Sequence, residues 1–177
     1  PMPKNFKGEL RPYQKAGYDW FYFLRKWNFG GCLADDMGLG KTIQTLALLQ
    51  KVKEDAAEAL IAKDLFDSTA AATVNQPSLI VMPTSLIYNW LREAQKFTPD
   101  LKIIVYTGSL RDKNLDQFAH ADVVLSTYGI IRMDIDLFKS FYFNYIILDE
   151  SQIIKNPISK ISRSVRSLKS KFKLVLS

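Results

Sequence analysis

Residues 34–42 read ADDMGLGKT and stand between a short apolar run and a helical pattern. Gly38 and Gly40 allow backbone N–H groups to close around an anion, because glycine has no Cβ to block the approach. Lys41 supplies a positive charge for phosphates, and the N-terminal end of the following helix favours anions at the same place. The general phosphate-loop pattern has glycine where Asp35 stands, so the match departs by one residue. The stretch predicts a nucleotide site, with a glycine-rich turn and a surface lysine as the alternative.

Two acidic residues, Asp149 and Glu150, follow the apolar run at 145–148. Ligands of an open parallel sheet bind at the carboxyl ends of its strands, so this pair and the phosphate loop are expected to meet at one edge. Asp149 and the hydroxyl of Thr42 are ligand types that suit Mg²⁺, and Glu150 is expected to act as general base or to position a water. The alternative is a strand that ends in solvent with two charged residues.

Apolar runs of strand length alternate with helical patterns along the chain, which predicts an α/β fold with a mostly parallel sheet covered by helices on both faces. Strands are expected at 31–34, 79–82, 103–106, 123–126, 145–148 and 174–176. Helices are expected from Pro12 and over 41–53, 85–97, 111–119, 129–139 and 157–168. Asn156 is the expected N-cap of the last helix, with Pro157 at its first position.

The remaining local expectations concern one ambiguous segment and the aromatic residues. The alanine-rich residues 51–76 are expected to prolong the second helix to about Phe66 and then to form a mobile loop. Trp20 and Phe21 are expected in the core by their helical spacing, and Trp90 is favoured for the core over stacking on a base.

Composition indicates one globular domain, since 47% of the 177 residues are hydrophobic and 24% are charged. We predict no membrane span, because no run of 18 apolar residues occurs, and no signal peptide. The single cysteine, Cys32, cannot form an internal disulfide, which favours a reducing compartment. Because the chain ends inside an apolar run, we expect it to be a fragment of a longer protein.

The net charge of +6 is concentrated near the end of the chain. Residues 151–177 contain seven basic and no acidic residues, whereas the first 150 contain 17 basic and 18 acidic residues. A local positive field favours a polyanionic partner, and a solvated helix face is the alternative. In the helix expected over 157–168, Lys160 and Arg163 lie opposite an apolar stripe, which consists of Ile158, Ile161, Val165 and Leu168.

In this order the motifs resemble the N-terminal RecA-like lobe of Swi/Snf-type superfamily-two helicases, over nearly the whole chain. Leu10-Arg11-Pro12-Tyr13-Gln14 is similar to the family's adenine-sensing segment, and residues 35–42 are close to its phosphate loop, which also lacks the first glycine. Asp149-Glu150-Ser151-Gln152 resembles the Asp-Glu box, in which many members have Ala and His in place of Ser151 and Gln152. Glutamine can still donate a hydrogen bond but does not titrate near neutral pH.

The resemblance implies a P-loop NTPase fold that binds ATP and Mg²⁺. It implies a catalytic set made of Lys41, Asp149, Glu150 and Gln152. It implies nucleotide contacts from Arg11, Gln14, Asp36, Met37, Gly38, Leu39, Gly40, Lys41 and Thr42, and metal ligands from Thr42 and Asp149.

Three further blocks resemble segments that hold a DNA backbone in this family. They are Pro83-Thr84-Ser85-Leu86 with Asn89-Trp90, then Ser126-Thr127-Tyr128, and, more loosely, Tyr106-Thr107-Gly108-Ser109. The implied nucleic-acid contacts are Thr84, Ser85, Asn89, Gly108, Ser109, Thr127, Lys155, Lys160 and Arg163. Thr84 and Ser85 have helix capping as an alternative role, and capping is compatible with phosphate binding.

The resemblance implies ATP-driven movement along double-stranded DNA, with remodelling of a protein–DNA complex such as a nucleosome or a DNA-bound polymerase. A second RecA-like lobe of the same protein is the implied partner, so the isolated lobe is expected to be weakly active. A prokaryotic, nucleoid-associated cytoplasmic location is favoured, with the nucleus expected for a eukaryotic source. The alternatives are a superfamily-two lobe that acts on RNA or single strands, and a catalytically silent lobe that only binds a partner protein.

Overall fold

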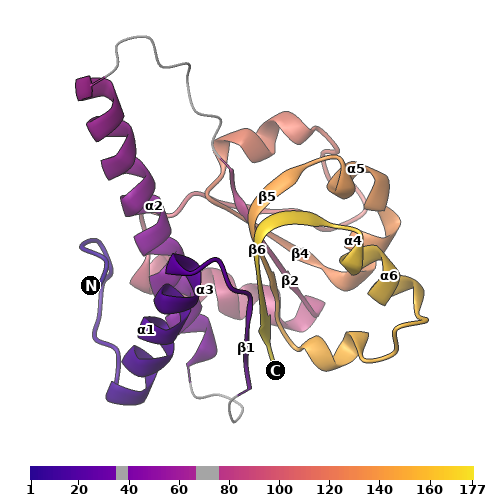
Figure 1. The fold of residues 1–177 in the computed structure, drawn as a ribbon. Coiled ribbons are helices and arrows are strands. Elements are labelled where there is room, and N and C mark those ends of the chain that lie inside the picture. Colours follow the sequence, from indigo (N-terminus) through magenta and orange to yellow (C-terminus); the bar gives the residue numbers. More distant parts are fainter. Residues whose placement is uncertain (35–39, 67–75) are drawn as a thin grey trace.

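The computed structural model describes residues 1–34, 40–66 and 76–177, which form one six-stranded sheet with helices on both faces (Figure 1). The strands are β1 (Gly31–Leu33), β2 (Ser78–Met82), β3 (Ile103–Val105), β4 (Val123–Thr127), β5 (Tyr142–Leu148) and β6 (Lys169–Leu176). Their order across the sheet is β1-β6-β5-β2-β4-β3, and every neighbouring pair is parallel. The predicted α/β fold is confirmed, and all the described strand pairs are parallel.

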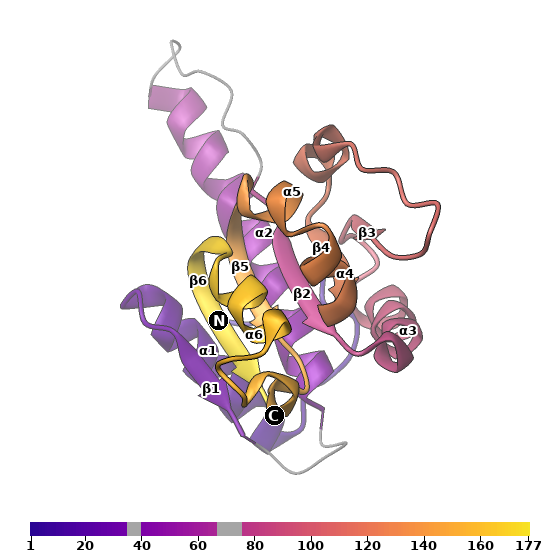
Figure 2. The ribbon, with the colours of Figure 1, turned by 90° about the vertical axis from the view of Figure 1, so that its right-hand side faces the viewer.

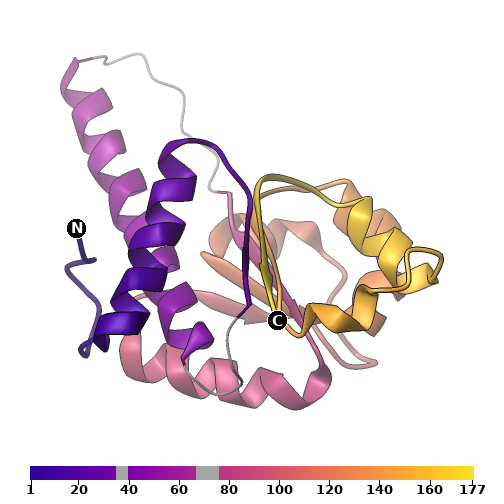
Figure 3. The ribbon, with the colours of Figure 1, turned by 60° about the horizontal axis from the view of Figure 1, so that its bottom comes forward.

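The helices form two layers, one on each face of the sheet (Figures 1 and 3). The first layer contains α1 (Pro12–Lys26), α2 (Lys41–Phe66) and α3 (Ile87–Phe97). The second contains α4 (Tyr128–Met133), α5 (Ile135–Lys139), α6 (Lys160–Arg166) and the 3-10 helix η2 (Leu115–His120). None of the described helices is both long and apolar enough to cross a lipid bilayer.

The strands serve both layers because successive side chains of a strand point to opposite faces. In β2, Ile80 and Met82 belong to the core under the first layer, whereas Leu79 and Val81 belong to the core under the second. A strand buried on both faces reads as a continuous apolar run, and this explains why these runs were visible in the sequence.

The second helix extends to Phe66, as predicted. Its first half is buried against the sheet, with Leu46, Ala47 and Leu48 at most 1% exposed. Its second half is exposed from Ala56 to Leu65 and projects beyond the sheet (Figure 1). The predicted mobile loop falls on residues 67–75, which lie outside the described part of the chain.

The helix predicted over 111–119 is wrong: the structure has only the 3-10 helix η2, from Leu115 to His120. Two side chains near its start accept hydrogen bonds from backbone N–H groups. Asp112 accepts a hydrogen bond of 3.0 Å from the N–H of Asn114, and Asn114 accepts one of 3.0 Å from the N–H of Asp116. Such local bonds compete with helical ones, so the predicted α-helix does not form here.

The helix predicted over 129–139 is divided into α4 and α5 at Asp134. The side chain of Asp134 is buried and accepts hydrogen bonds from Arg111 and Tyr106. The predicted segment is therefore helical on both sides of a break that holds a buried carboxylate in place.

The last helix starts later than predicted, at Lys160, and Ser159 caps it in place of Asn156. Ser159 Oγ accepts a hydrogen bond of 3.1 Å from the N–H of Ser162, whereas Asn156 Oδ1 accepts one of 3.0 Å from Ile158. Ile158 therefore precedes the helix and is 71% exposed, which removes it from the predicted apolar stripe.

The aromatic predictions are correct for two of the three residues. Phe21 is fully buried and Trp90 is 1% exposed, whereas Trp20 is 39% exposed. Trp20 is also in contact with the ring of Phe21, with ring centroids 5.7 Å apart. Helical spacing places Trp20 at the margin of the buried face of α1, where only part of a large indole can be covered.

Candidate nucleotide and nucleic-acid site

A cavity of about 260 Å³ lies at the carboxyl edge of the sheet and joins the two predicted motifs. Figure 2 shows β2, β5 and β6 running side by side towards this edge, where the C-terminus lies. The lining residues are Gly40, Lys41 and Thr42 at the start of α2, Asp149 and Glu150 after β5, and Leu86, Asn89, Trp90 and Glu93 from the segment of α3. Segments more than a hundred residues apart in sequence therefore share one cavity.

The phosphate-loop end of the cavity is tightly packed at Gly40. Its φ of +91° lies in the region that side-chain-bearing residues rarely adopt. A Cβ built on Gly40 would lie 2.2 Å from Gln14 Nε2 and 3.0 Å from Ile43 Cγ2. Glycine is therefore favoured here by the backbone conformation, and a Cβ would also require the end of the Gln14 side chain to move. The predicted loop residues Asp36, Met37, Gly38 and Leu39 lie outside the described residues.

The predicted adenine-sensing residue Gln14 stands directly behind Gly40. Its side chain is 9% exposed, and its Oε1 accepts a hydrogen bond of 2.9 Å from the N–H of Arg11. Arg11 itself is exposed at the N-terminus of α1. The predicted adenine-sensing segment thus lies against Gly40 through Gln14, whereas the lining of the cavity includes neither Arg11 nor Gln14.

Lys41 and Thr42 both line the cavity from the first turn of α2. Lys41 Nζ donates a hydrogen bond to the carbonyl oxygen of Ser177, which follows β6. The N-terminal end of α2 opens on the same cavity, so its unpaired N–H groups and partial positive charge add to the charge of Lys41.

Asp149 is held in a fixed orientation by three elements. Trp90 Nε1 donates a hydrogen bond of 2.9 Å to its Oδ2, and the N–H of Glu150 donates one of 2.9 Å to its Oδ1. The hydroxyl of Tyr128 donates a hydrogen bond of 2.7 Å to its carbonyl oxygen. Burial raises the pKa of Asp149, and the bond from Trp90 opposes that rise. The carboxylate is thus aimed before any ligand arrives.

Glu150 adopts a left-handed conformation, with φ +53° and ψ +48°. Such backbone is strained for a residue with a side chain and is typical of functional sites. Gln152 Nε2 donates a hydrogen bond to Glu150 Oε2. The structure therefore brings the predicted catalytic residues Glu150 and Gln152 into direct contact.

Glu93 is a cavity residue that the sequence analysis did not identify. It lies on the face of α3 that also carries Asn89 and Trp90, at a helical spacing of three to four residues. That spacing was the available signal. Burial raises the pKa of Glu93, and a hydrogen bond with Asn89 opposes the rise. Asn89, predicted as a DNA contact, therefore lies in the wall of the nucleotide cavity.

The donor set suits a metal that arrives with a phosphate ligand. The lining includes the three carboxylates of Glu93, Asp149 and Glu150 and one lysine, so an unaccompanied polyphosphate would meet an excess of negative charge. Among the described residues no group of three acidic, histidine or cysteine side chains is placed to hold an ion alone. Mg²⁺ typically takes one or two carboxylates and completes its shell with substrate phosphates and water, and Asp149 with Thr42 fits this pattern.

The predicted DNA-facing blocks follow three adjacent strands at the same edge. Thr127 at the end of β4 pairs with Met82 at the end of β2, and Val105 at the end of β3 pairs with Leu125. Thr84 and Ser85 lie in the segment after β2, Thr127 is the last residue of β4, and Gly108 and Ser109 lie in the segment after β3. One edge therefore carries the nucleotide cavity and, beside it, a row of small polar residues.

The capping alternative for Thr84 and Ser85 is wrong. Neither the 3-10 helix η1 (Thr84–Leu86) nor α3 has a side-chain cap, and both residues are exposed. Thr127, in contrast, caps α4 by accepting a hydrogen bond of 3.3 Å from the N–H of Ile130, and it is 7% exposed. Thr84 and Ser85 thus keep their hydroxyls available for a ligand, whereas Thr127 has a structural task.

The segment around Gly108 is anchored by a buried ion pair that no sequence pattern had revealed. Arg111 Nε donates a hydrogen bond of 2.6 Å to Asp134 Oδ2, and Arg111 Nη1 donates one of 2.6 Å to the carbonyl oxygen of Gly108. Tyr106 also donates to Asp134, at 2.7 Å. These contacts, the guanidinium above all, lower the pKa of Asp134 to about 2. Gly108 has a φ of +85°, and a Cβ built on it would meet no atom within 4 Å. The described contact that holds this residue is therefore the hydrogen bond from Arg111 to its carbonyl oxygen.

The predicted basic contacts lie on the segment that follows Glu150. Lys155 follows the 3-10 helix η3 (Ser151–Ile154), and Lys160 and Arg163 lie on α6. All three side chains are exposed, and none forms an ion pair with another described residue. They provide positive charge without an acidic partner on the segment that follows the Asp149–Glu150 pair.

Comparison with known proteins agrees with this arrangement. The family described as "SNF2-related domain" matches residues 13–177. The chain is 46% identical over 176 residues to the "Putative ATP-dependent helicase/translocase YwqA" of Bacillus subtilis. The aligned region covers 98% of this chain and 17% of that protein. It is also 35% identical over 179 residues to the "TATA-binding protein-associated factor MOT1" of Saccharomyces cerevisiae. That aligned region covers 99% of this chain and 9% of the yeast protein.

A solved structure shows the same fold. The "Sulfolobus solfataricus SWI2/SNF2 ATPase core in complex with dsDNA" matches with a TM-score of 0.82 and 38% sequence identity. The match covers 99% of this chain and 33% of that one. The chain thus corresponds to a small part of each of these relatives.

Proposed function

The chain belongs to the SNF2-related domain family, and from this membership we propose that it is the ATP-binding lobe of an ATPase that moves along double-stranded DNA. The observation that carries the proposal is the single cavity in which Gly40, Lys41 and Thr42 face Asp149 and Glu150. This set contains a phosphate-binding turn, a lysine, a hydroxyl and two acids, which are the groups that phosphoryl transfer from ATP requires.

Each group has a distinct task in the proposed reaction. Lys41 and the N-terminal amides of α2 bind the phosphates of ATP. Thr42 and Asp149 would hold Mg²⁺, which neutralises charge on the phosphates when bound. Glu150 accepts a proton from a water whose oxygen attacks the γ-phosphorus, while the bond between that phosphorus and the β,γ-bridging oxygen breaks. Gln152 orients the Glu150 carboxylate through its amide.

The structure also supports a physical route by which DNA would influence this reaction. Thr84 and Ser85 stand exposed at the beginning of the segment that continues as α3, and Trp90 in α3 holds Asp149. A phosphate bound at the first turn would shift or stiffen a helix that is hydrogen-bonded to the metal-binding acid. We propose that this helix transmits DNA binding to the nucleotide cavity.

A complete motor of this kind needs a second RecA-like lobe, which we propose as the partner that closes over ATP. Arginine fingers contribute roughly 10³–10⁵ in rate in related phosphoryl-transfer enzymes, so we expect the isolated lobe to hydrolyse ATP slowly. The proposed target is duplex DNA with a bound protein. The duplex in the Sulfolobus complex and the TATA-binding protein in the name of the yeast relative support that choice for this chain.

The test compares ATP hydrolysis by the two-lobe protein in the presence of duplex DNA, single-stranded DNA and RNA at equal ionic strength. We expect duplex DNA to stimulate most, and Lys41→Ala to abolish the stimulated rate. Strongest stimulation by RNA or single strands would favour another superfamily-two activity. Failure to bind nucleotide at all would favour a silent lobe that only binds a partner.

A further inference from the structure

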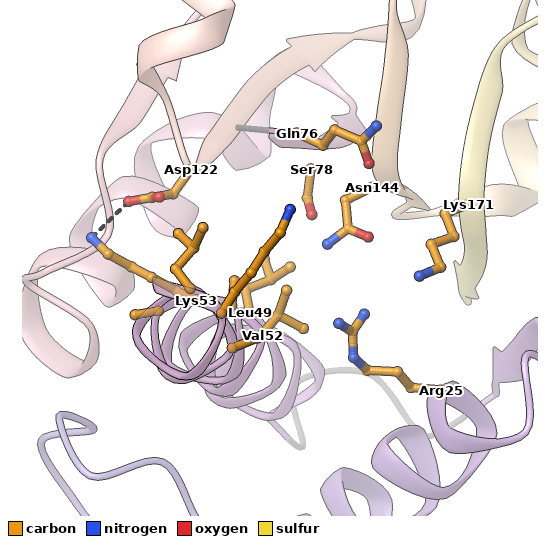
Figure 4. Close-up of a pocket in the computed structure, with 14 residues that line it drawn as sticks. Arg25, Leu49, Val52, Lys53, Gln76, Ser78, Asp122, Asn144 and Lys171 are labelled. Atoms are coloured by element: carbon orange, nitrogen blue, oxygen red, sulfur yellow. Dashed lines mark hydrogen bonds and ion pairs between the residues drawn. The ribbon is translucent and has the colours of Figure 1, made fainter. Parts of the chain in front are cut away.

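We propose that the lobe has a second ligand site, at the opposite edge of the sheet, which binds a phosphate monoester with a small apolar body. A cavity of about 520 Å³ lies there, between the second half of α2 and the beginnings of the strands (Figure 4). Ser78 begins β2 at this cavity, whereas Met82 ends the same strand at the nucleotide edge. The site is therefore separate from the ATP cavity.

The charge of the lining favours an anion. It contains four basic side chains, Arg25, Lys53, Lys63 and Lys171, and one acidic side chain, Asp122. Asp122 is already paired, since Lys53 Nζ lies 2.9 Å from its Oδ2. The charged ends of Arg25 and Lys171 converge on the side of the cavity opposite α2 (Figure 4), and neither side chain forms an ion pair with a described residue. Two facing cations repel each other, and an anion between them would convert that repulsion into attraction.

Arg25 is held in place by rings and left with an unused donor. Its guanidinium carbon lies 5.0 Å from the ring centroid of Phe172 and 5.8 Å from that of Tyr145. Its Nη1 is buried and has no hydrogen-bond partner among the described atoms. A buried donor without a partner costs free energy, and a guanidinium is best satisfied by the paired oxygens of a phosphate or carboxylate. The fixed orientation reduces the entropy that binding would cost.

The rest of the lining distinguishes between these anions. Ser78 and Asn144 contribute a hydroxyl and an amide from the sheet edge, and neither side chain makes a hydrogen bond with another described residue. Together with Arg25 and Lys171 they give this part of the lining four side chains that can donate hydrogen bonds, and the several oxygens of a tetrahedral phosphate can accept from more of them than the two oxygens of a carboxylate can. Opposite them Leu49, Val52 and Leu60 form an apolar wall. A cavity of this size and mixed lining is typical of small-molecule sites, which is why we assign a monoester rather than free phosphate.

The experiment is a titration of the ¹⁵N-labelled 177-residue chain with phenyl phosphate at low salt, followed by NMR. Inorganic phosphate and phenol are titrated in parallel. We expect saturable shifts at Arg25, Ser78, Asn144 and Lys171, with a Kd of about 1 mM or tighter. Inorganic phosphate should bind at least about fivefold more weakly, and phenol should produce no saturable shift.

Two variants and a matched control locate the site. Lys171→Gln and Arg25→Gln should each weaken phenyl phosphate binding about tenfold or more. Lys173→Gln changes the same charge on the same strand, outside the cavity lining, and should leave the Kd within about twofold. Because Arg25 packs on two rings, Lys171→Gln keeps the test valid if Arg25→Gln unfolds. Unsaturable binding, shifts confined to residues 40–42, equal affinity for inorganic phosphate, or an unchanged Kd in Lys171→Gln would each overturn the proposal.

Discussion

The indole N–H of Trp90 donates a hydrogen bond of 2.9 Å to the carboxylate of Asp149, with both side chains buried. Trp90 belongs to α3, and the exposed Thr84 and Ser85 lie in η1, directly before that helix. Asp149 follows β5 and lines the nucleotide cavity. One hydrogen bond therefore connects the proposed DNA-contacting helix to the proposed metal ligand. An aromatic side chain without an N–H donor, such as phenylalanine, would have been sufficient for packing alone.

Trp90→Phe should remove this link while keeping an aromatic ring in the core. A hydrogen bond to a charged group is worth about 1.5–3 kcal/mol, so we expect DNA stimulation of hydrolysis in the two-lobe protein to fall about tenfold or more. The KM for ATP should change much less. Trp27→Phe, at a position 58% exposed, is the control. A lowered melting temperature with an unchanged stimulation ratio would show that Trp90 has only a packing role.

Gly40→Ala should disrupt the phosphate loop. The added methyl would lie 2.2 Å from Gln14 Nε2, at a φ that alanine disfavours, so we expect a loss of about 1–3 kcal/mol in unfolding free energy and of measurable nucleotide binding. Gly129→Ala is the matched control, because a Cβ at Gly129 meets no atom within 4 Å and the residue lies in α4. Gly129→Ala should be neutral or slightly stabilising in urea titrations. Equal behaviour of the two variants would contradict the close packing described for Gly40.

Substitutions on the polar row should separate DNA contact from stability. Thr84→Ala and Ser85→Ala remove exposed hydroxyls that cap no helix, so unfolding free energies should change by less than about 0.5 kcal/mol. The same variants should weaken duplex binding several-fold, since each phosphate contact contributes about 1 kcal/mol. Thr127→Ala should instead destabilise the chain by about 1 kcal/mol through its lost cap. Fluorescence anisotropy with labelled duplex and urea titrations give the two quantities, and unchanged duplex affinity in the Thr84 and Ser85 variants would remove them from the interface.

The buried carboxylate of Asp134 should make stability depend on acid pH. Its pKa falls from an ordinary 3.8 to about 2 on folding, so its stabilising contribution is complete above pH 4 and is lost as the pH falls towards 2. That shift corresponds to about 2 kcal/mol, and the side chains of Asp134 and Arg111 are only 5% and 7% exposed.

Asp134→Asn should therefore cost at least about 2 kcal/mol at pH 7, and its difference from the wild type should shrink as the pH falls from 4 to 2. Asp136→Asn, two residues further along the chain in α5, is the control, because that side chain is 94% exposed. Urea titrations across this pH range give the comparison. A difference that stays constant with pH would contradict the ionic role of Asp134.

The sequence was informative wherever one kind of interaction dominates. Strands such as β2, buried on both faces, appear as unbroken apolar runs, and the alternation of such runs with helices predicted the fold class. The meeting of Lys41 with Asp149 could be anticipated because the carboxyl ends of parallel strands share one edge.

The incorrect predictions have a different cause, since each of these local structures depends on a partner distant in sequence or on competing local hydrogen bonds. The break at Asp134 exists because Arg111 and Tyr106 bind its carboxylate across more than twenty residues, which no periodicity reveals. The late start of α6 reflects a choice between two capping side chains, Asn156 and Ser159, that both suit the role. Glu93 lies in the cavity wall beside Asn89 and Trp90, and the apolar pattern of α3 predicts only which face is buried, not which polar residue faces a cavity.

The start of α2 and the acids after β5 are proposed to form one site for ATP with its metal. The most direct test is a calorimetric titration of the 177-residue chain with a non-hydrolysable ATP analogue, with Mg²⁺ and with EDTA, for the wild type and for Lys41→Ala. We expect saturable binding that is weakened at least about tenfold without Mg²⁺ and lost in Lys41→Ala. Binding that is indifferent both to Mg²⁺ and to the loss of Lys41 would contradict the account.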